Sequence, residues 1–387
     1  MDIDAVAESS KVDILFVAAN ARSLVSNRGE LIKELTGRGF NVAALVPSYD
    51  YSSEVDSLGI EITQYDLDRH SLNPFKFIYQ FFLLVKVMRE ISPSSVFCYA
   101  VKPIVLGAMA ARMTGVKNVF CLVTGLGYAF CADGIKPLLI RQISRGLYGF
   151  ASLLSSVFIF QNDDDKRELE KGWLFRLSGA LGRERLVVPG SGVDVDDYPF
   201  CEVDLSHYSF VCTARLIKEK GVFEYAEAAR IVKESHPDVN FYLAGALDEN
   251  LVSSVSRKDV EKWQDTFGVT YLGKVDDVKG VIENSTFFVL PSYREGTSRS
   301  ILEAMSMGRP VITTDVPGCN GPVLDGVNGI VVKPKDARAL AAAMIEVMQD
   351  EARIQSMSKA SRERAVSIYD VRKVNATMFG SLKKYLS

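Results

Sequence analysis

Histidine, paired cysteines and long apolar runs are all scarce in this sequence of 387 residues. It has three histidines, His70, His207 and His236, and six cysteines that form neither a CxxC pair nor the spacing of a zinc site. We therefore expect no metal centre, and we interpret the cysteines as buried thiols of a reducing compartment. No apolar run is long enough to span a bilayer. Residues 1–10 are acidic and polar, so we expect no signal peptide.

Net charge and composition set the broad class of the protein. The formal net charge is −3, which gives no general attraction to nucleic acid, so no nucleic-acid partner is expected. With 48% hydrophobic and 24% charged residues, the composition is that of a globular protein. The chain is longer than one ordinary domain, and a polar, irregular stretch at 194–199 predicts a boundary near residue 200.

Predicted strands alternate with predicted helices in both halves. The first half begins with a strand at 13–18, a loop at 19–27, a helix at 28–38 and a second strand at 41–46. Such short connections are typical of a parallel sheet, and the alternation starts again with a strand at 209–213. The sequence thus predicts an α/β protein with two facing Rossmann-like domains and a ligand cleft at their seam. The first turn lacks GxGxxG, which argues against ordinary dinucleotide binding.

The stretch from residue 287 to 303 is the most informative in the chain. An apolar run at 287–290 predicts a strand, 291–297 a loop, and a helix begins at about Ser298. Unpaired backbone N–H groups and the positive end of the helix dipole then point into the loop, which favours an anion such as phosphate. Glu295, in the loop, is suited to accept hydrogen bonds from sugar hydroxyls, and Glu303 lies about one and a half turns into the helix. The alternative, that both are solvated surface carboxylates, remains open.

Other loops follow strands of the same predicted sheet. Because the carboxyl ends of parallel strands meet at one edge, Arg215 and Lys220 are expected to lie near Glu295 and to form a diphosphate clamp. A solvated basic turn is the alternative for these two cations. The loop at 314–318 either borders the same ligand or is an ordinary turn. The loop expected to hold a nucleobase through backbone groups consists of Gly273, Lys274 and Val275.

A strongly apolar, aromatic helix is predicted at 75–91. Its simplest interpretation is a half-buried helix. The alternative is a face that enters a membrane interface, to which a second helix would add basic contacts with anionic lipid. The basic residues of that second helix are Lys136, Arg141 and Arg145.

A set of motifs in the second half carries a family resemblance. The set comprises Arg215 with Lys220-Gly221, Glu295-Gly296 with Glu303-Ala304, Gly308-Arg309-Pro310, Asp315 with Gly318, and Gly326 with Gly329. In this combination the sequence resembles the retaining glycosyltransferases of family 4, and the likeness covers nearly the whole chain. The resemblance implies the GT-B fold.

The resemblance also implies a division of tasks. Residues 1–200 would form the acceptor-binding domain, 201–369 the domain that binds the nucleotide-sugar donor, and 370–387 a helix that crosses back onto the first domain. Transfer would proceed with retention and without a metal, and no other cofactor is implied because the nucleotide sugar is a co-substrate.

Residue roles follow by position. Arg215 and Lys220 would hold the donor diphosphate, Glu295 would contact the hydroxyls of the donor sugar, and Glu303 would contact the ribose. Loop amides would serve the sugar and the phosphates. They belong to Gly296, Thr297, Ser298 and Arg299.

A narrower likeness rests on several short stretches in both halves. These are Asn27-Arg28-Gly29, Leu67-Asp68-Arg69, Asn73-Pro74, Lys102-Pro103, Thr124-Gly125-Leu126-Gly127-Tyr128 and Arg294-Glu295-Gly296-Thr297. They resemble bacterial enzymes that extend undecaprenyl-diphosphate-linked sugars for O-antigen, capsule or glycoprotein glycans, commonly from UDP-linked hexoses or N-acetylhexosamines. The likeness implies a lipid-linked or oligosaccharide acceptor and a cytoplasmic location at the inner face of the membrane. The implied acceptor-side residues are Arg28, His70, Thr124, Gly125 and Gly127.

Some points remain open at the level of sequence. Cys319-Asn320-Gly321-Pro322 stands where that group often carries Cys-Arg-Glu, which bears on the choice of donor sugar. His70 is either a surface histidine or a group near the acceptor. The competing functions are a nucleotide-sugar epimerase of related fold and a non-catalytic two-domain sugar-binding protein.

Overall fold

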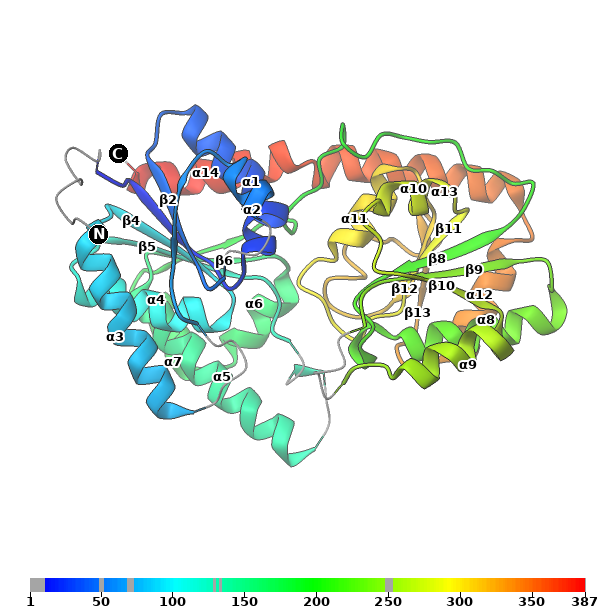
Figure 1. The fold of residues 1–387 in the computed structure, drawn as a ribbon, viewed down its shortest axis with the longest axis horizontal. Helices are drawn as coiled ribbons and strands as arrows, with labels where there is room; N and C mark the ends of the chain where they lie inside the picture. The colour runs from blue at the N-terminus through cyan, green and yellow to red at the C-terminus, as the bar shows by residue number, and fades with distance from the viewer. Residues whose placement is uncertain are drawn as a thin grey trace. The chain divides into compact units, whose positions relative to one another are not determined.

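The computed structural model describes residues 11–48, 52–67, 73–127, 130–131, 134–247 and 253–386 (Figure 1). The chain divides into two compact units, which are described here one at a time. The first unit contains Met1–Thr124, Gly134–Val188 and Asn375–Ser387, and the second contains Gly125–Asp133 and Pro189–Val374. His70 lies outside the described residues.

The first unit is built on a seven-stranded parallel sheet with the order β3-β2-β1-β4-β5-β6-β7. Its strands are β1 (Ile14–Val17), β2 (Val42–Val46), β3 (Glu61–Gln64), β4 (Ser95–Tyr99), β5 (Asn118–Val123), β6 (Val157–Phe160) and β7 (Glu184–Val187). The inner strands are apolar on both faces because helices cover both faces, whereas the edge strands β3 and β7 are only partly buried. The predicted alternation of strands and helices in this half is confirmed.

Helices cover both faces of this sheet. They are α1 (Ala21–Gly37), α2 (Ser52–Asp56), α3 (Pro74–Ile91), α4 (Val101–Met113), α5 (Ile135–Leu154), α6 (Asp163–Glu170), α7 (Trp173–Ala180) and α14 (Val371–Leu382), with a 3-10 turn at Lys383–Tyr385. In Figure 1, α1 and α14 lie on one face and α3, α4, α5 and α7 on the other. This division follows from the right-handed crossovers. Those from β1 to β3 run in one direction along the sheet, and those from β3 to β7 run in the other.

The segment expected to be a loop at 19–27 is helical instead. Helix α1 begins at Ala21, because the side chain of Asn20 accepts a hydrogen bond of 2.7 Å from the backbone N–H of Ser23 and caps the first turn. The sequence signal was this cap residue followed by Leu24 at the start of the apolar face. Arg28 therefore lies in the middle of α1 rather than at its start.

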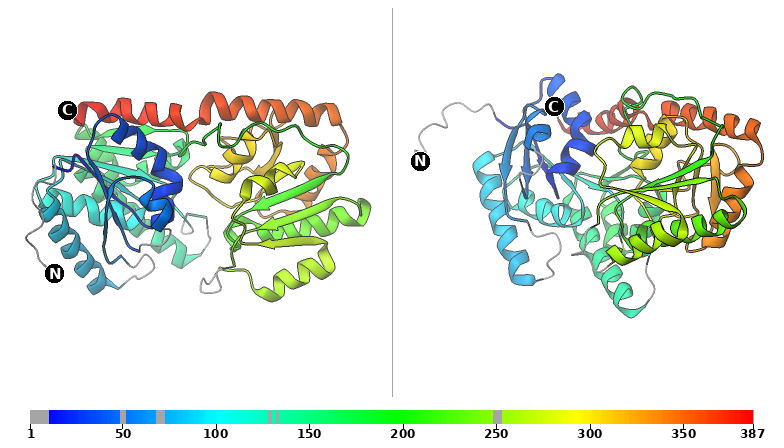
Figure 2. Two further views of the ribbon diagram at one scale, coloured as in Figure 1. Left: turned by 45° about the horizontal axis from the view of Figure 1, so that its top comes forward. Right: turned by 45° about the vertical axis from the view of Figure 1, so that its right-hand side comes forward.

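The second unit contains a six-stranded parallel sheet with the order β10-β9-β8-β11-β12-β13. The strands are β8 (Ser209–Thr213), β9 (Asn240–Ala244), β10 (Val269–Gly273), β11 (Phe287–Leu290), β12 (Val311–Thr314) and β13 (Gly329–Val332). The helices are α8 (Val222–Ser235), α9 (Arg257–Phe267), α10 (Val278–Glu283), α11 (Arg299–Ser306), α12 (Ala337–Val347) and α13 (Glu351–Arg364), with a 3-10 turn at Lys218–Lys220 and a π-helical turn at Ala365–Tyr369. Figure 2 shows this sheet with helices on both faces. Asp336 caps α12, accepting from Ala339 N–H at 2.9 Å.

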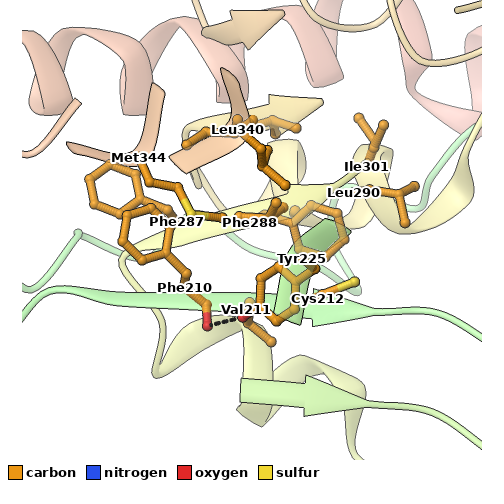
Figure 3. Close-up of a cluster of buried hydrophobic side chains, with 14 of the residues drawn as sticks. Phe210, Val211, Cys212, Tyr225, Phe287, Phe288, Leu290, Ile301, Leu340 and Met344 are labelled. Atoms are coloured by element: carbon orange, nitrogen blue, oxygen red, sulfur yellow. Dashed lines mark hydrogen bonds between the residues drawn. The ribbon is translucent and has the colours of Figure 1, made fainter. Parts of the chain in front are cut away.

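An aromatic stack forms the centre of the second unit (Figure 3). The rings of Phe210 in β8 and Phe287 in β11 are stacked with centroids 4.8 Å apart, and Phe241 in β9 continues the stack at 5.3 Å from Phe210. The buried hydroxyl of Tyr225 in α8 donates to the Phe210 carbonyl at 2.8 Å. Each such buried aromatic side chain contributes about 1.5–3 kcal/mol relative to an exposed one. The stack thus fixes β8 beside β11, the two strands that carry the most important loops.

Helix α14 begins in the second unit and ends in the first. Its start is fixed where Val193 N–H donates to the Tyr369 carbonyl at 2.8 Å and Val371 N–H donates to the Val193 carbonyl at 2.9 Å. Within the first unit, the guanidinium of Arg38 lies 4.2 Å from the centroid of the Phe379 ring. The hydroxyl of Tyr385 donates to Glu184 at 3.1 Å. Among the described residues, no helix is both long and apolar enough to cross a bilayer.

A buried arginine ties the beginning of the second unit to its sheet. Arg309 is 0% exposed, and its guanidinium donates to the Ser285 carbonyl at 2.9 Å, to the Met307 carbonyl at 3.0 Å and to the Cys201 carbonyl. Burial lowers the pKa of Arg309. The pairing of one side chain with several carbonyls satisfies groups that would otherwise be buried without a donor.

We expect Arg309→Met to lower the free energy of unfolding by more than about 3 kcal/mol, because it leaves several buried carbonyls unsatisfied. The matched control is Arg353→Met, since Arg353 pairs with Glu346 at the surface and should change stability by less than about 1 kcal/mol. Urea unfolding followed by circular dichroism measures both. Equal midpoints for the two variants would contradict the role given to Arg309.

Candidate functional site

The loop between β11 and α11 forms the centre of the candidate site. β11 ends at Leu290, and α11 begins at Arg299 after Ser298, whose side chain caps the helix by accepting from Ile301 N–H. This is the strand, loop and helix predicted from the sequence. The first-turn amides of α11 have no partner within the helix, so they and the helix dipole favour an anion at this point.

Backbone hydrogen bonds hold this loop between two neighbouring loops. Tyr293 N–H donates to the Glu219 carbonyl at 2.8 Å, Glu295 N–H to the Pro317 carbonyl at 2.9 Å, and Ser298 N–H to the Gly318 carbonyl at 3.1 Å. The strands explain the arrangement, because β8 and β12 are the two neighbours of β11 in the sheet. The expected convergence of the loops after β8, β11 and β12 is therefore confirmed.

Two glycines permit this close packing. Gly318 has φ +79°, and a Cβ there would lie 2.5 Å from the Glu295 carbonyl oxygen. Gly125 has φ +118°, and a Cβ there would lie 3.0 Å from the backbone nitrogen of Gly296. Any side chain at either position would push the loop out of place. Gly125 thus packs directly against the loop that carries Glu295.

Lys220 and Glu295 form an ion pair at the edge of the sheet. The Lys220 ammonium donates to Glu295 Oε1, and the hydroxyl of Ser292 donates to the same oxygen at 2.7 Å. Their side chains are only 20% and 14% exposed, so the interpretation of Glu295 as a solvated loop residue is wrong. The pair offers a cation to a phosphate and a hydrogen-bond acceptor to a hydroxyl, side by side. Arg215 lies after β8 in the same loop as Lys220, with an exposed side chain.

Glu303 is buried inside α11. Its Oε1 accepts from Arg299 Nε at 2.7 Å, one helical turn away, and the Tyr198 hydroxyl also hydrogen-bonds to the carboxylate. The side chain is 11% exposed, so Glu303 is not the exposed helix residue of the alternative interpretation. Burial raises the pKa of Glu303, although the hydrogen bonds and the charge of Arg299 oppose this effect.

The predicted base-binding loop lies at the same sheet edge but farther along it. Gly273 ends β10, and its carbonyl accepts from Gly245 N–H at 2.8 Å, which joins it to the end of β9. Since β9 separates β10 from β8, a strand spacing of about 4.8 Å puts Gly273 about 10 Å from β8 and about 14 Å from β11. Lys274 is exposed and Val275 half-buried just beyond it. A ligand that contacted both ends of this edge would have to be elongated.

The implied acceptor residues fall in different parts of the structure. Arg28 is buried in α1, with its guanidinium 5.7 Å from the centroid of the Tyr99 ring. Thr124 directly follows β5 in the first unit and is half-buried. Gly125 and Gly127 belong to the second unit, where the segment beginning at Gly125 meets the Glu295 loop.

Sequence reasoning missed a group of residues that contacts Tyr293 and Arg294 and so supports the loop after β11. The Tyr293 hydroxyl donates to Glu224 Oε1 in α8 at 2.7 Å, and the Lys335 ammonium lies 5.2 Å from the Tyr293 ring centroid. The guanidinium of Arg294 lies 5.9 Å from the ring centroid of Phe130. An aromatic residue directly after Pro291 and Ser292 was a weak signal for Tyr293. Nothing in the sequence indicated its partners, which come from distant segments.

The sequence analysis also singled out the loop that contains Asn320 and the six cysteines. Asn320, in the loop that departs from the related pattern, donates to Asp315 Oδ1 at 2.8 Å. All six cysteines are free, four of them buried (Cys98, Cys121, Cys212 and Cys319) and two half-buried (Cys131 and Cys201). In the described part of the chain, no three His, Cys, Asp or Glu side chains come together in a way that would hold a metal ion.

The chain is similar in sequence to known glycosyltransferases. The family profile described as "Glycosyl transferases group 1" matches residues 207–350, and that described as "Glycosyl transferase 4-like" matches residues 13–158. Among curated proteins, the chain is 28% identical to the N,N'-diacetylbacillosaminyl-diphospho-undecaprenol alpha-1,3-N-acetylgalactosaminyltransferase of Campylobacter jejuni, over 92% of this chain and 94% of that protein. It is 27% identical to the UDP-Gal:alpha-D-GlcNAc-diphosphoundecaprenol alpha-1,3-galactosyltransferase of Escherichia coli, over 74% of each.

Solved structures agree on the fold. Sucrose-phosphate synthase from Thermosynechococcus elongatus superposes with a TM-score of 0.78 at 16% identity, over 97% of this chain and 99% of that one. Anabaena HepE, in complex with UDP and glucose, superposes with a TM-score of 0.74 at 16% identity, over 96% and 100% of the two chains. At this identity the likeness shows the fold, which is the predicted GT-B fold of two Rossmann-like domains. The two family profiles, which together match most of the chain, and the curated relatives show that the chain belongs to the family 4-like, group 1 glycosyltransferases.

Proposed function

We propose that this protein is a retaining, metal-independent glycosyltransferase that extends a lipid-linked glycan. The donor is a UDP-linked hexose or N-acetylhexosamine, and the acceptor is a hydroxyl of a sugar carried on undecaprenyl diphosphate. The observation that carries the proposal is the Lys220–Glu295 pair at the N-terminus of α11, because it combines a phosphate-binding cation with a hydroxyl-binding carboxylate. The activities by which the Campylobacter and Escherichia relatives are named support the acceptor class and the alpha linkage.

The second unit binds the donor in this proposal. Lys220, Arg215 and the first-turn amides of α11 hold the diphosphate, Glu295 accepts from hydroxyls of the transferred sugar, and Glu303 accepts from the ribose. The uracil then lies toward Gly273, Lys274 and Val275. The sequence of groups along the sheet edge, from β11 through β8 and β9 to β10, matches the elongated form of a nucleotide sugar.

The transfer needs no protein nucleophile in this account. A bond forms between the acceptor oxygen and the anomeric carbon while the bond from that carbon to the phosphate oxygen breaks on the same face. The proton of the acceptor hydroxyl passes to the departing phosphate oxygen. Lys220 and the helix N-terminus stabilise the negative charge that grows on the UDP, which is the group the protein is built to bind.

The acceptor is bound chiefly by the first unit, with Thr124 among its contacts, and also by Gly125 and Gly127, which belong to the second unit. A polyprenyl carrier keeps the acceptor at a bilayer, so we place the reaction in the cytoplasm at the inner membrane face. The product enters O-antigen, capsule or glycoprotein glycan synthesis. An epimerase would convert the nucleotide sugar alone, and a sugar-binding protein would convert nothing.

The function is tested by UDP release. We expect the purified protein to release UDP from one UDP-hexose or UDP-N-acetylhexosamine only when a polyprenyl-diphosphate N-acetylhexosamine is present. NMR of the product should show an alpha linkage. Conversion of the donor without acceptor would favour an epimerase, and saturable binding without turnover on any acceptor of this class would favour a binding protein.

Lys220→Ala and Glu295→Ala should each lower kcat/KM more than about tenfold, which is about 1.4 kcal/mol of transition-state stabilisation. Calorimetry should separate their roles. Lys220→Ala should weaken the binding of UDP and of UDP-sugar alike, whereas Glu295→Ala should weaken UDP-sugar much more than UDP. Lys218→Ala is the control, since Lys218 is exposed in the same 3-10 turn. If both variants kept wild-type kinetics, the assigned site would be wrong.

The affinity for UDP-sugar should depend on pH through Glu303. Because burial raises the pKa of Glu303 above the ordinary 4.5, its carboxylate takes up a proton at a pH where a solvated carboxylate is still ionised. A protonated carboxyl is a poorer acceptor, so affinity should be full above the raised pKa and should fall as the pH falls through it. UDP-sugar is the probe because its diphosphate has no group that titrates in this range.

Glu303→Gln should bind UDP-sugar more weakly than wild type and should lack this fall. Glu363→Gln, at an exposed glutamate of α13, should keep the wild-type profile. Binding isotherms measured between about pH 4.5 and neutrality decide the matter. A fall of equal size in Glu303→Gln and wild type would assign the titration to another group.

A further inference from the structure

Two helices of the first unit expose large apolar side chains in their first turns. On α3, Phe75 is 81% exposed, and on α5, Ile135 is 87% exposed. We call the exposed set the apolar tips: Phe75, Ile78, Tyr79 and Phe82 on α3, and Ile135, Leu138, Leu139 and Ile143 on α5. The buried residues of α3 begin at Gln80, and most of those of α5 lie at Tyr148 or beyond. The two helices are therefore anchored by their later turns, while their first turns project.

Helix length explains the projection. α3 has 18 residues and α5 has 20, which correspond to about 27 and 30 Å, while α4 between them has 13, about 20 Å. The strands beneath are no longer than α4, since β5, which has 6 residues, spans about 20 Å. The first turns of α3 and α5 thus extend past both the sheet and α4, as Figure 1 shows for the lower ends of these helices.

The direction of the projection follows from the topology. In a parallel sheet a crossover helix starts at the carboxyl edge of the strand before it, so α3 starts beyond the end of β3 and α5 beyond the end of β5. Thr124, an implied acceptor residue, directly follows β5 at this edge. The apolar tips and Thr124 therefore belong to the same edge of the first sheet.

The charges of the two helices have one prevailing sign. α5 carries three basic residues, Lys136, Arg141 and Arg145, and no acidic residue in its whole length. α3 carries Lys76, Lys86 and Arg89, and its single acidic residue, Glu90, is at the far end from the tip. Lys76 and Lys136 each stand in the first turn of their helix, next to the most exposed apolar residue. Apolar and aromatic side chains flanked by basic residues are suited to the headgroup region of an anionic bilayer.

We propose that the apolar tips of α3 and α5 dock the enzyme on an anionic lipid bilayer. The apolar side chains enter the boundary between headgroups and acyl chains, and Lys76 and Lys136 meet lipid phosphates. The biological meaning of this docking rests on the proposed function, because it would bring the diphosphate of a lipid-linked acceptor to the edge of the sheet that carries Thr124. Two separate projecting tips with prevailing positive charge fit a bilayer better than a flat protein interface.

Vesicle flotation tests the docking with the full chain. We expect wild type to bind vesicles of phosphatidylcholine with about a third phosphatidylglycerol, to bind pure phosphatidylcholine much less, and to lose binding at high salt. The variant Phe75→Glu/Ile135→Glu should reduce binding to anionic vesicles at least about tenfold. Met113→Glu is the control, because Met113 is an exposed apolar residue at the end of α4, at the opposite edge of the same sheet.

A second readout separates this inference from the proposed function. The double variant should keep wild-type turnover on a short-chain, water-soluble acceptor diphosphate and should lose most turnover on a long-chain acceptor embedded in vesicles. If the wild type bound vesicles but turned over neither acceptor, the proposed function would be wrong and the docking surface would stand. Wild-type vesicle binding by the double variant would overturn the docking surface. The docking surface would also be overturned if the wild type bound no vesicles but formed dimers, and the double variant did not. The apolar tips would then contact a second copy of the chain.

Discussion

The candidate site depends on the way the loop after β11 is held. Its backbone donates to the loops that follow β8 and β12, and glycine at 318 and at 125 allows neighbouring backbone to approach within van der Waals contact. These contacts involve main-chain groups, so they fix the positions of Glu295 and of the N-terminus of α11 independently of side-chain interactions. The aromatic stack of Phe210 and Phe287 beneath keeps the two principal strands in place. Rigid support of this kind is what a binding site for a charged ligand requires.

Much of this arrangement was visible in the sequence. The alternating strands and helices and the strand–loop–helix around Glu295 are local features, and local sequence patterns predicted them. The nearness of Lys220 to Glu295 followed from one topological rule about parallel strands, because β8 and β11 are neighbours. Here the family resemblance and the reasoning from residues led to the same groups.

The remaining features are set by tertiary packing, which the sequence alone did not reveal. The start of α1 was missed because its first turns contain several polar residues, and the cap at Asn20 followed by Leu24 is a weak signal. The burial of Glu303 depends on Tyr198, which comes from a segment more than 100 residues earlier. The attachment of the segment after Thr124 to the second unit depends on its contact with Gly296. The amphipathic pattern of α3 was clear, but only the lengths of its neighbours show which turns project.

The ion pair between Lys220 and Glu295 has a consequence for selectivity. Each partner satisfies the other, and both are largely withdrawn from water. A lone phosphate that captured Lys220 would leave the carboxylate poorly compensated, and a lone sugar that captured Glu295 would do the same to the ammonium. A molecule that presents phosphate and hydroxyls together replaces both halves of the pair at once. In the proposed function, the pair therefore favours an intact nucleotide sugar over its separate fragments.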